Sequence, residues 1–379
     1  MTRIFLLFII LASFNTNQAF ARRNSQVEAT LKQGTIIEGR KSFKQLLSKQ
    51  ISKQIRIFWW NIAGESFTDR PLAKVKKDND PYWTQNGSIL GNLIAHVKND
   101  QPDIIILGEF PGSKISDYEL ALPSYQYTQQ IPYYAGARNS ITVFSRLPLV
   151  EIEQNILSII DQWPGQISKA AKQKNQKFWR SKHITDRLFQ LLQVQTDEGE
   201  FVLSPLHFVN PWPAYSAIYR NGDYPGAGAL SYLAVAREQM LRGKVVKNKK
   251  GVQIYNPLQN QVRDYLYQID ALDLKDEPLL LIGDFNSPSR ILPYGYPKFL
   301  DRSLLVPGLG HQLLADQFQN PFAKNIGDVE TIPTKTAGKG KPKVRIDKAF
   351  HSSQLKTAAI WIYKYAGSDH YPIQLDIEL

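Results

Sequence analysis

The sequence predicts a single α/β domain over residues 51–379. Short apolar runs with the composition of buried strands alternate with segments whose apolar residues recur at helical spacing. No polar linker long enough to divide these residues is present, and no internal repeat is visible. The chain has 379 residues, 43% of them hydrophobic, and can therefore bury a large core.

The first half of the domain opens with strand and helix signals. An apolar and aromatic run over residues 55–60 predicts a strand. Residues 88–99 predict a helix, because their apolar side chains fall on one helical face. Three isoleucines and a leucine form a buried strand over residues 104–107, and an apolar run predicts another over residues 141–144.

The second half continues the alternation. A strand is predicted over residues 201–206, and apolar stripes predict helices over residues 227–241 and 257–272. A short, wholly apolar strand follows over residues 279–282. The last predicted strands cover residues 344–350, 358–363 and 373–379.

The first residues predict an export signal. Arg3 precedes an apolar run over residues 4–12, and Ala19-Phe20-Ala21 has the small residues of a cleavage site. The run is shorter than the about 20 residues that a membrane-spanning helix needs. We therefore expect a signal peptide over residues 1–21, a polar lead-in over residues 22–50, and a secreted or periplasmic mature protein without a transmembrane segment.

The composition limits the chemistry. The chain has no cysteine, which excludes disulfides, thiolate nucleophiles and cysteine-bound zinc. The formal net charge of +12 favours a polyanionic partner, either nucleic acid or an anionic lipid surface. Charge alone does not choose between these partners, and the oligomeric state is left open.

Polar groups that suit a hard metal ion follow several predicted strands. Asp284 and Asn286 come directly after a buried strand, and Ser368-Asp369-His370 stands just before the last strand. Asn61 and Glu109 also stand at strand ends. Carboxylate and amide oxygens are the ligands that Mg²⁺ and Mn²⁺ prefer, and such ions assist attack on phosphate esters. The pattern therefore indicates metal-dependent hydrolysis of a phosphoester.

These motifs, in this order, resemble those of the endonuclease/exonuclease/phosphatase superfamily. The similarity covers about residues 55–379. It implies a four-layer α/β sandwich, in which two packed mixed β-sheets are flanked by helices and the catalytic groups gather at one rim. The matching motifs are Trp60-Asn61-Ile62, Leu107-Gly108-Glu109, Phe144-Ser145-Arg146-Leu147-Pro148, His207, Gly283-Asp284-Phe285-Asn286, Arg345-Ile346-Asp347 and Ser368-Asp369-His370.

The resemblance implies a role for each residue at a metal or a phosphate. Glu109 is expected to bind the metal ion directly, with Asp369 close to it. Asn61 is expected to support the metal-bound water or a phosphate oxygen. Asn286 and Arg146 are expected to bind the substrate phosphate.

The resemblance also implies proton-transfer roles. Asp284 would position or deprotonate the attacking water, and Asp347 would set the tautomer of His370. His370 would act as a base or as a cation that stabilises the phosphate. His207 matches the secreted deoxyribonuclease branch, where a histidine assists the leaving group. Ala63 stands where abasic-site endonucleases carry an aspartate, which counts against that branch.

Three functions remain open from the sequence. The first is a secreted, endonuclease-like phosphodiesterase that acts on nucleic acid. The second is a sphingomyelinase-like or phosphoinositide phosphatase-like hydrolase of phospholipid headgroups. The third is a binding protein with a relic site. The aromatic segment from Trp212 to Tyr224 does not choose among them, because its aromatic side chains suit nucleobases, a lipid interface or a packed loop tip.

Overall fold

A computed structural model describes residues 54–63, 89–134, 136–158, 186–209, 246–247, 253–254, 257–287, 308–322, 346–363, 368 and 370–379. The expected signal peptide, the lead-in, the helix predicted over residues 227–241, the aromatic segment from Trp212 to Tyr224, and Asp369 all lie outside these residues. No described helix has the length and apolarity needed to cross a membrane.

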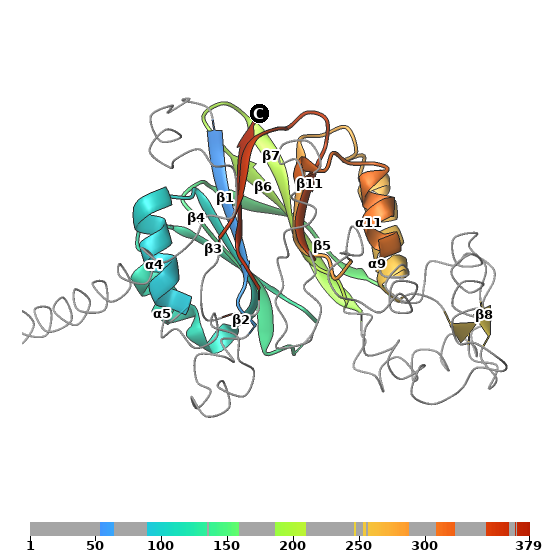
Figure 1. The fold of residues 1–379 in the computed structure, drawn as a ribbon, viewed down its shortest axis with the longest axis horizontal. Helices are drawn as coiled ribbons and strands as arrows, with labels where there is room; N and C mark the ends of the chain where they lie inside the picture. Colours follow the sequence, from blue (N-terminus) through green and yellow to red (C-terminus); the bar gives the residue numbers. More distant parts are fainter. Residues whose placement is uncertain are drawn as a thin grey trace, which may run out of the picture.

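Two mixed β-sheets form the centre of the described part (Figure 1). The first has six strands in the order β12-β13-β1-β2-β4-β3, and the second has five in the order β11-β10-β7-β6-β5. The strands of the first sheet are β1 (Gln54–Asn61), β2 (Ile104–Pro111), β3 (Tyr127–Pro132), β4 (Asn139–Ser145), β12 (Lys356–Ile362) and β13 (Ile373–Glu378). Those of the second are β5 (Leu149–Leu157), β6 (Arg187–Gln195), β7 (Glu200–His207), β10 (Leu279–Asp284) and β11 (Asp347–His351). The short strands β8 (Val246–Lys247) and β9 (Gln253–Ile254) pair separately.

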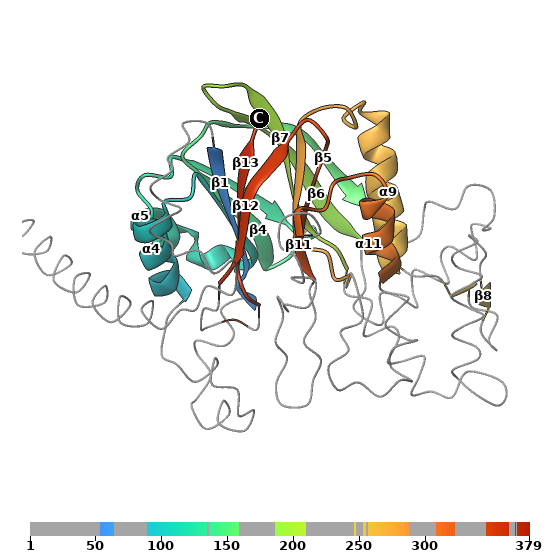
Figure 2. The same cartoon turned by 45° about the horizontal axis from the view of Figure 1, so that its top comes forward.

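Helices cover the outer face of each sheet (Figures 1 and 2). On the first sheet lie α4 (Ile89–Asp100) and α5 (Ile115–Ala121), which follows the 3₁₀ turn η3 (Gly112–Lys114). On the second lie α9 (Pro257–Ala271) and α11 (Gly308–Ala315). The four layers confirm the predicted sandwich of two mixed sheets flanked by helices.

Strand alternation produces three apolar layers between these four. On β1, Ile57 and Trp59 face the second sheet, whereas Phe58 and Trp60 face α4. The strands β2 and β10 divide their apolar residues in the same way. Both faces of these strands are buried, which explains their nearly continuous apolar sequences.

The sequence did not predict every element. The strands β3, β5 and β6 were missed, as were α5 and α11. β3 and β5 carry many exposed polar residues and are edge strands, so their sequences lack the apolar runs of the central strands. The strand predicted over residues 344–350 begins only at Asp347 within the described residues.

A buried polar network lies near the start of β1. The Arg56 guanidinium donates to both carboxylate oxygens of Asp376, at 2.9 and 2.8 Å, and to the backbone oxygen of Asp100 at 2.6 Å. The His96 ring lies 3.1 Å from Asp100 Oδ2 through Nδ1 and 2.7 Å from Gln374 Oε1 through Nε2. Burial lowers the pKa of His96 to about 3, against the hydrogen bond with Gln374. Burial also raises the pKa of Asp100 to about 7, against the positive charge of Arg56.

This network predicts a hidden pH dependence. Between about pH 4 and 6.5 the folded pair holds one proton on Asp100, and the unfolded chain holds one on His96. The two contributions to stability therefore cancel. In Asp100→Asn only the histidine remains, and its pKa is depressed in the folded state. We expect the free energy of unfolding of this variant to rise with pH relative to wild type, by up to about 1.4 kcal/mol per pH unit.

Urea unfolding of both proteins at half-unit steps from pH 4 to 6.5 measures this difference. The raised pKa values of Asp103 and Asp376 are common to both proteins, so their effects drop out of the comparison. Parallel stability curves for the two proteins would contradict the prediction.

Candidate active site

The carboxyl ends of four strands meet at one end of the sandwich. In the first sheet β1 and β2 run parallel, and Asn61 pairs with Gly108. In the second sheet β7 and β10 run parallel, and His207 pairs with Asp284. On the other side of β10, Asp284 pairs with Asp347, the first residue of β11. This end of parallel strands is where α/β proteins commonly place their ligands.

Strand alternation turns these polar residues toward the space between the sheets. Trp59 and Ile282 belong to the apolar core between the two sheets. Asn61 and Asp284 stand two positions further along the same strands and therefore face the same space. Both are buried.

Glu109 reaches the site by an exception to this rule. Leu107 faces the helix layer, and simple alternation would turn Glu109 the same way. The pairing of β2 with β4 shifts between Leu107 and Phe110, and Glu109 has a φ of 51°. A bulge re-aims a side chain, and a positive φ at a non-glycine residue stores strain that is common at functional sites. The bulge thus turns the carboxylate toward the inter-sheet space.

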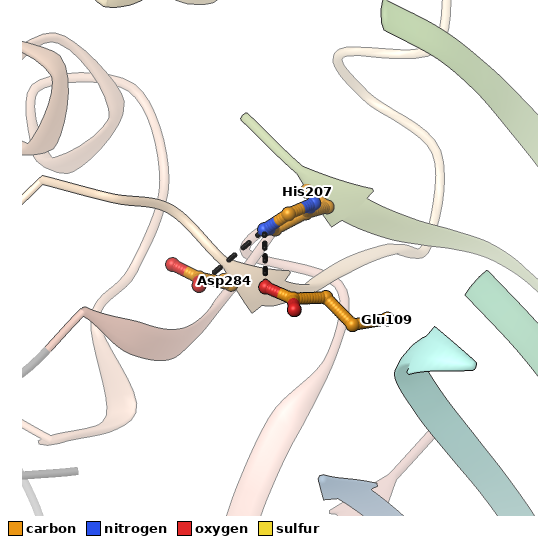
Figure 3. Close-up of side chains that lie close together, drawn as sticks. All are labelled: Glu109, His207 and Asp284. Carbon is orange, nitrogen blue, oxygen red and sulfur yellow. Dashed lines mark ion pairs between the residues drawn. The ribbon is translucent and has the colours of Figure 1, made fainter. Parts of the chain in front are cut away.

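The first cluster consists of Glu109, His207 and Asp284 (Figure 3). The Nε2 atom of His207 lies 3.7 Å from Glu109 Oε1 and 3.5 Å from Asp284 Oδ2. Figure 3 shows one ring nitrogen of His207 facing both carboxylates, each of which comes from a different strand. The amide nitrogen of Asn61 donates to the same two oxygens, at 3.1 and 3.2 Å.

The second cluster is built on His370 and Asp347. The His370 Nδ1 atom lies 2.7 Å from Asp347 Oδ2, and Trp59 Nε1 donates to Asp347 Oδ1 at 2.9 Å. Burial raises the pKa of Asp347, and the neighbouring His370 opposes this shift. With Nδ1 held by Asp347, the Nε2 atom of His370 points to Asp284 Oδ2 at 3.9 Å. Asp284 Oδ2 is therefore approached by both histidines.

Hydrogen bonds attach the C-terminal motif to β1. The Ser368 hydroxyl donates to the backbone oxygen of Asn61 at 2.7 Å and accepts from the His370 amide at 3.1 Å. The Trp60 indole donates to the His370 carbonyl at 3.0 Å. Residues at opposite ends of the domain therefore hold His370 in place.

Asn286 also lies at the site. Its backbone amide donates to Asp284 Oδ1, and its side-chain amide donates to the Phe208 carbonyl, both at 2.8 Å. These bonds tie the end of β10 to the end of β7. Asn286 was predicted to bind phosphate, and in this structure its side chain spans the two strand ends.

Asn61 was predicted among the metal-binding residues, and in this structure its side chain contacts two carboxylates and a backbone amide. Its amide oxygen accepts from the Ala63 amide at 2.9 Å, while its amide nitrogen faces Glu109 and Asp284. A nitrogen donor is not a metal ligand. Asn61 thus orients the two carboxylates.

Arg146 is the predicted site residue that the structure places elsewhere. Its neighbour Ser145 pairs with Ile104, at the opposite end of β2 from Glu109, a separation of about 17 Å along the strand. Its Nη2 atom donates to the Pro102 carbonyl at 2.7 Å and to the Tyr125 hydroxyl at 3.3 Å. The prediction of a phosphate contact is wrong, because β4 runs antiparallel to β2 and carries its end away from the site.

Tyr133 was missed by the sequence analysis. It follows β3, its hydroxyl accepts a hydrogen bond from the Glu109 amide, and its ring centroid lies 4.4 Å from that of His207. Burial raises the pKa of Tyr133 well above its usual value, which keeps the phenol neutral. Arg187 packs on the same ring, with its guanidinium carbon 5.1 Å from the centroid. Recognising either residue required the strands β3 and β6, whose sequences carry weak signals.

The first cluster has the donors that a divalent metal ion needs. Ligand atoms of Glu109, His207 and Asp284 lie within 4.8 Å of one another. The carboxylate oxygens of Glu109 and Asp284 suit a divalent cation. The Glu109 side chain is 30% exposed, so an ion can reach it from solvent. The residues present therefore fit a divalent metal ion.

Comparisons with known proteins agree with this geometry. The sequence model of the Endonuclease/Exonuclease/phosphatase family matches residues 58–370. An endonuclease/exonuclease/phosphatase from Beutenbergia cavernae DSM 12333 is similar in structure, with a TM-score of 0.50 and 16% identity over 86% of this chain and 72% of that one. No curated protein sequence matches the chain.

Two further solved structures are similar at lower scores. A mannosyl-6-phosphatase from Bacteroides thetaiotaomicron VPI-5482 has a TM-score of 0.47 and 13% identity, over 86% of this chain and 100% of that one. D. rerio TDP2, complexed with a single-strand DNA product, has a TM-score of 0.47 and 11% identity, over 86% and 99%.

Proposed function

The chain belongs to the endonuclease/exonuclease/phosphatase family, and we propose that it hydrolyses phosphodiester bonds of nucleic acid with the help of Mg²⁺ or Mn²⁺. The observation that carries this proposal is the approach of His207 and His370 to the same carboxylate oxygen of Asp284, at 3.5 and 3.9 Å. One carboxylate flanked by two imidazoles can serve proton transfer on both sides of a reacting phosphorus atom.

Glu109 would hold the metal ion, together with Asp284. Such an ion neutralises phosphate charge and stabilises the leaving oxygen when it is bound. Asn61 keeps both carboxylates oriented through its two hydrogen bonds. Asp369, which was also predicted to lie near the metal, is outside the described residues.

The proton transfers belong to the chain's own residues. Asp347 holds Nδ1 of His370, so a neutral ring presents Nε2 as an acceptor. His370 and Asp284 together would take the proton of an attacking water. His207, protonated when the substrate binds, would give its own proton to the leaving oxygen; its Nε2 atom lies 3.5 Å from Asp284 Oδ2.

The charge of the chain supports nucleic acid as the substrate. The formal net charge is +12, and polyphosphates bind basic proteins through the release of counterions. We further propose that the protein is exported, because Arg3, the apolar run over residues 4–12 and Ala19-Phe20-Ala21 together form a signal-peptide pattern.

Assays with purified protein test this function. We expect nicking of supercoiled plasmid DNA in Mg²⁺ and its loss in excess chelator. A parallel assay measures release of phosphocholine from sphingomyelin vesicles and of phosphate from phosphoinositides. Turnover of a lipid without nicking of DNA would reject nucleic acid as the substrate but would support phosphoester hydrolysis. No metal-stimulated turnover of any phosphoester would reject the hydrolase itself.

Replacing Glu109 with glutamine tests the expected metal ligand. The change keeps the size of the side chain and removes its negative charge. We expect the Mg²⁺ concentration needed for half-maximal activity to rise by at least about tenfold, with activity partly restored by excess Mg²⁺. Glu119→Gln, on the exposed face of α5, is the control and should leave the Mg²⁺ titration unchanged. A Glu109→Gln titration identical to wild type would contradict the assignment.

A further inference from the structure

We propose that Arg187 binds the phosphate of the substrate in a bidentate contact, in place of Arg146, which was predicted to contact the phosphate. This inference rests on the proposed function, since it names a further residue of the same site. It is carried by the position of Arg187, by its packing on Tyr133 and by its lack of hydrogen-bond acceptors among the described residues.

Arg187 lies at the same end of the sandwich as the two clusters. It is the first residue of β6, whose antiparallel partner β7 ends at His207. The register pairs Leu192 with Leu203, which places the start of β6 beside the end of β7. The backbone amide of Leu188 also donates to the Tyr133 carbonyl at 2.8 Å. This bond joins the two sheets beside Arg187.

The Tyr133 ring lies between Arg187 and the residues of the first cluster. The ring contacts the guanidinium of Arg187 and the imidazole of His207, and the Tyr133 hydroxyl accepts from the Glu109 amide. Burial lowers the pKa of Arg187, whereas the negative charges of Glu109 and Asp284 oppose that shift. An arginine stays charged even so, because its reference pKa is far above neutrality. Arg187 is therefore a cation beside the two carboxylates.

The donors of Arg187 have no acceptor within the described part of the chain. No hydrogen bond or ion pair of the Arg187 side chain is found there, and its Nε atom is buried without a partner. A guanidinium carries five N–H groups in a planar fork, and leaving buried donors unpaired costs stability. The two oxygens of a phosphate match this fork. A substrate phosphate near His207 would satisfy these donors.

Arg146 provides an internal comparison. Its guanidinium also packs on a tyrosine, 5.2 Å from the Tyr125 ring centroid, and its Nε atom is likewise buried without a partner. However, its Nη2 atom donates to Pro102 and Tyr125. The described residues thus include one arginine whose guanidinium binds Pro102 and Tyr125 and one whose guanidinium packs on Tyr133 beside the site.

Two substitutions of Arg187 test the proposal with a small diester, bis(p-nitrophenyl) phosphate, in Mg²⁺. Arg187→Met keeps the apolar stem on Tyr133 and removes the fork. We expect kcat/KM to fall about 10²–10³-fold, as when one donor to a developing oxyanion is removed. Arg187→Lys keeps the charge and should recover only part of this loss, because lysine cannot form the bidentate contact.

Arg146→Met is the matched control. It should lower the melting temperature while leaving kcat and KM within about twofold of wild type, since surface changes away from a site have small effects. A folded Arg187→Met variant with unchanged kcat/KM would overturn the proposal. Recovery of its activity by excess Mg²⁺ would also overturn it, because Arg187 would then act through Glu109 and Asp284.

A binding measurement separates this inference from the proposed function. We expect inorganic phosphate to raise the melting temperature of wild type and to raise that of Arg187→Met much less. Wild type could fail to hydrolyse any phosphoester and still show a larger phosphate-induced rise in melting temperature than Arg187→Met. That result would reject the proposed hydrolase function and support the phosphate contact of Arg187. Equal shifts in both proteins would overturn the phosphate contact whatever the activity.

Discussion

Replacing His370 with alanine is expected to lower kcat for phosphodiester hydrolysis by about 10²–10⁴-fold, the usual contribution of a positioned acid or base. His370 is fully buried and held by Asp347 at 2.7 Å, so its Nε2 atom has a fixed direction toward Asp284. His207 also approaches Asp284 Oδ2, at 3.5 Å, but it comes from β7 and is assigned to the leaving oxygen, so we do not expect it to replace His370. Single-turnover hydrolysis of a labelled DNA strand measures the chemical step directly.

The same substitution also carries a stability cost. Asp347 would keep the bond from Trp59 and lose its bond with His370, and one hydrogen bond contributes about 0.5–3 kcal/mol, most when a partner is charged. His351→Ala controls for this effect, because His351 is buried on the same strand β11 and its ring contacts Ser352 and Thr357. The control should lose stability and keep kcat. Near-wild-type kcat in folded His370→Ala would defeat the assignment.

Replacing Gly283 with alanine is expected to have the largest effect on stability. An added Cβ atom would lie 1.8 Å from the Leu206 carbonyl oxygen and 2.7 Å from its carbon. Both atoms are backbone of β7, so the clash can be relieved only by separating β7 from β10, the strands that carry His207 and Asp284. We expect a loss of unfolding free energy greater than the about 1–3 kcal/mol of ordinary overpacking.

Urea unfolding followed by tryptophan fluorescence measures this loss. Gly112→Ala is the control, because the atoms nearest to its added Cβ lie 3.8 Å away, in ordinary contact. It should change the free energy of unfolding by less than about 0.5 kcal/mol. Equal stability of the two variants would show that the β7–β10 pair can adapt.

Site residues could be predicted from the sequence where the strands that carry them have strong apolar patterns. Asp284 and Asn61 end strands with nearly continuous apolar sequences, so alternation and topology could place them in advance. Glu109 was predicted as a metal ligand and lies beside His207 and Asp284, but simple alternation would turn its side chain to the helix layer, and the bulge in β2 turns it inward. Arg146 was misplaced because its motif does not reveal that β4 runs antiparallel to β2.

Tyr133 and Arg187 show the other limit. Tyr133 follows β3, at an edge of the first sheet, and Arg187 is the first residue of β6, in the second sheet. Neither strand was predicted from the sequence. Their importance lies in contacts across the two sheets, with partners at Glu109 and His207 that are far away in sequence. Local sequence patterns do not predict such contacts, because the contacts arise from sheet pairing between segments that are distant in the sequence.

The amino-acid sequence alone determined the α/β class, the central strands and the polar residues at the ends of those strands. These are local properties, because they depend on apolar periodicity and on the residue types at each strand end. The tertiary fold adds the directions of those side chains, the removal of Arg146 from the site and the addition of Tyr133 and Arg187. The physical reason is that parallel pairing, a bulge and the packing of two sheets bring distant residues to within 4 Å of one another, for example His370 and Asp284 at 3.9 Å.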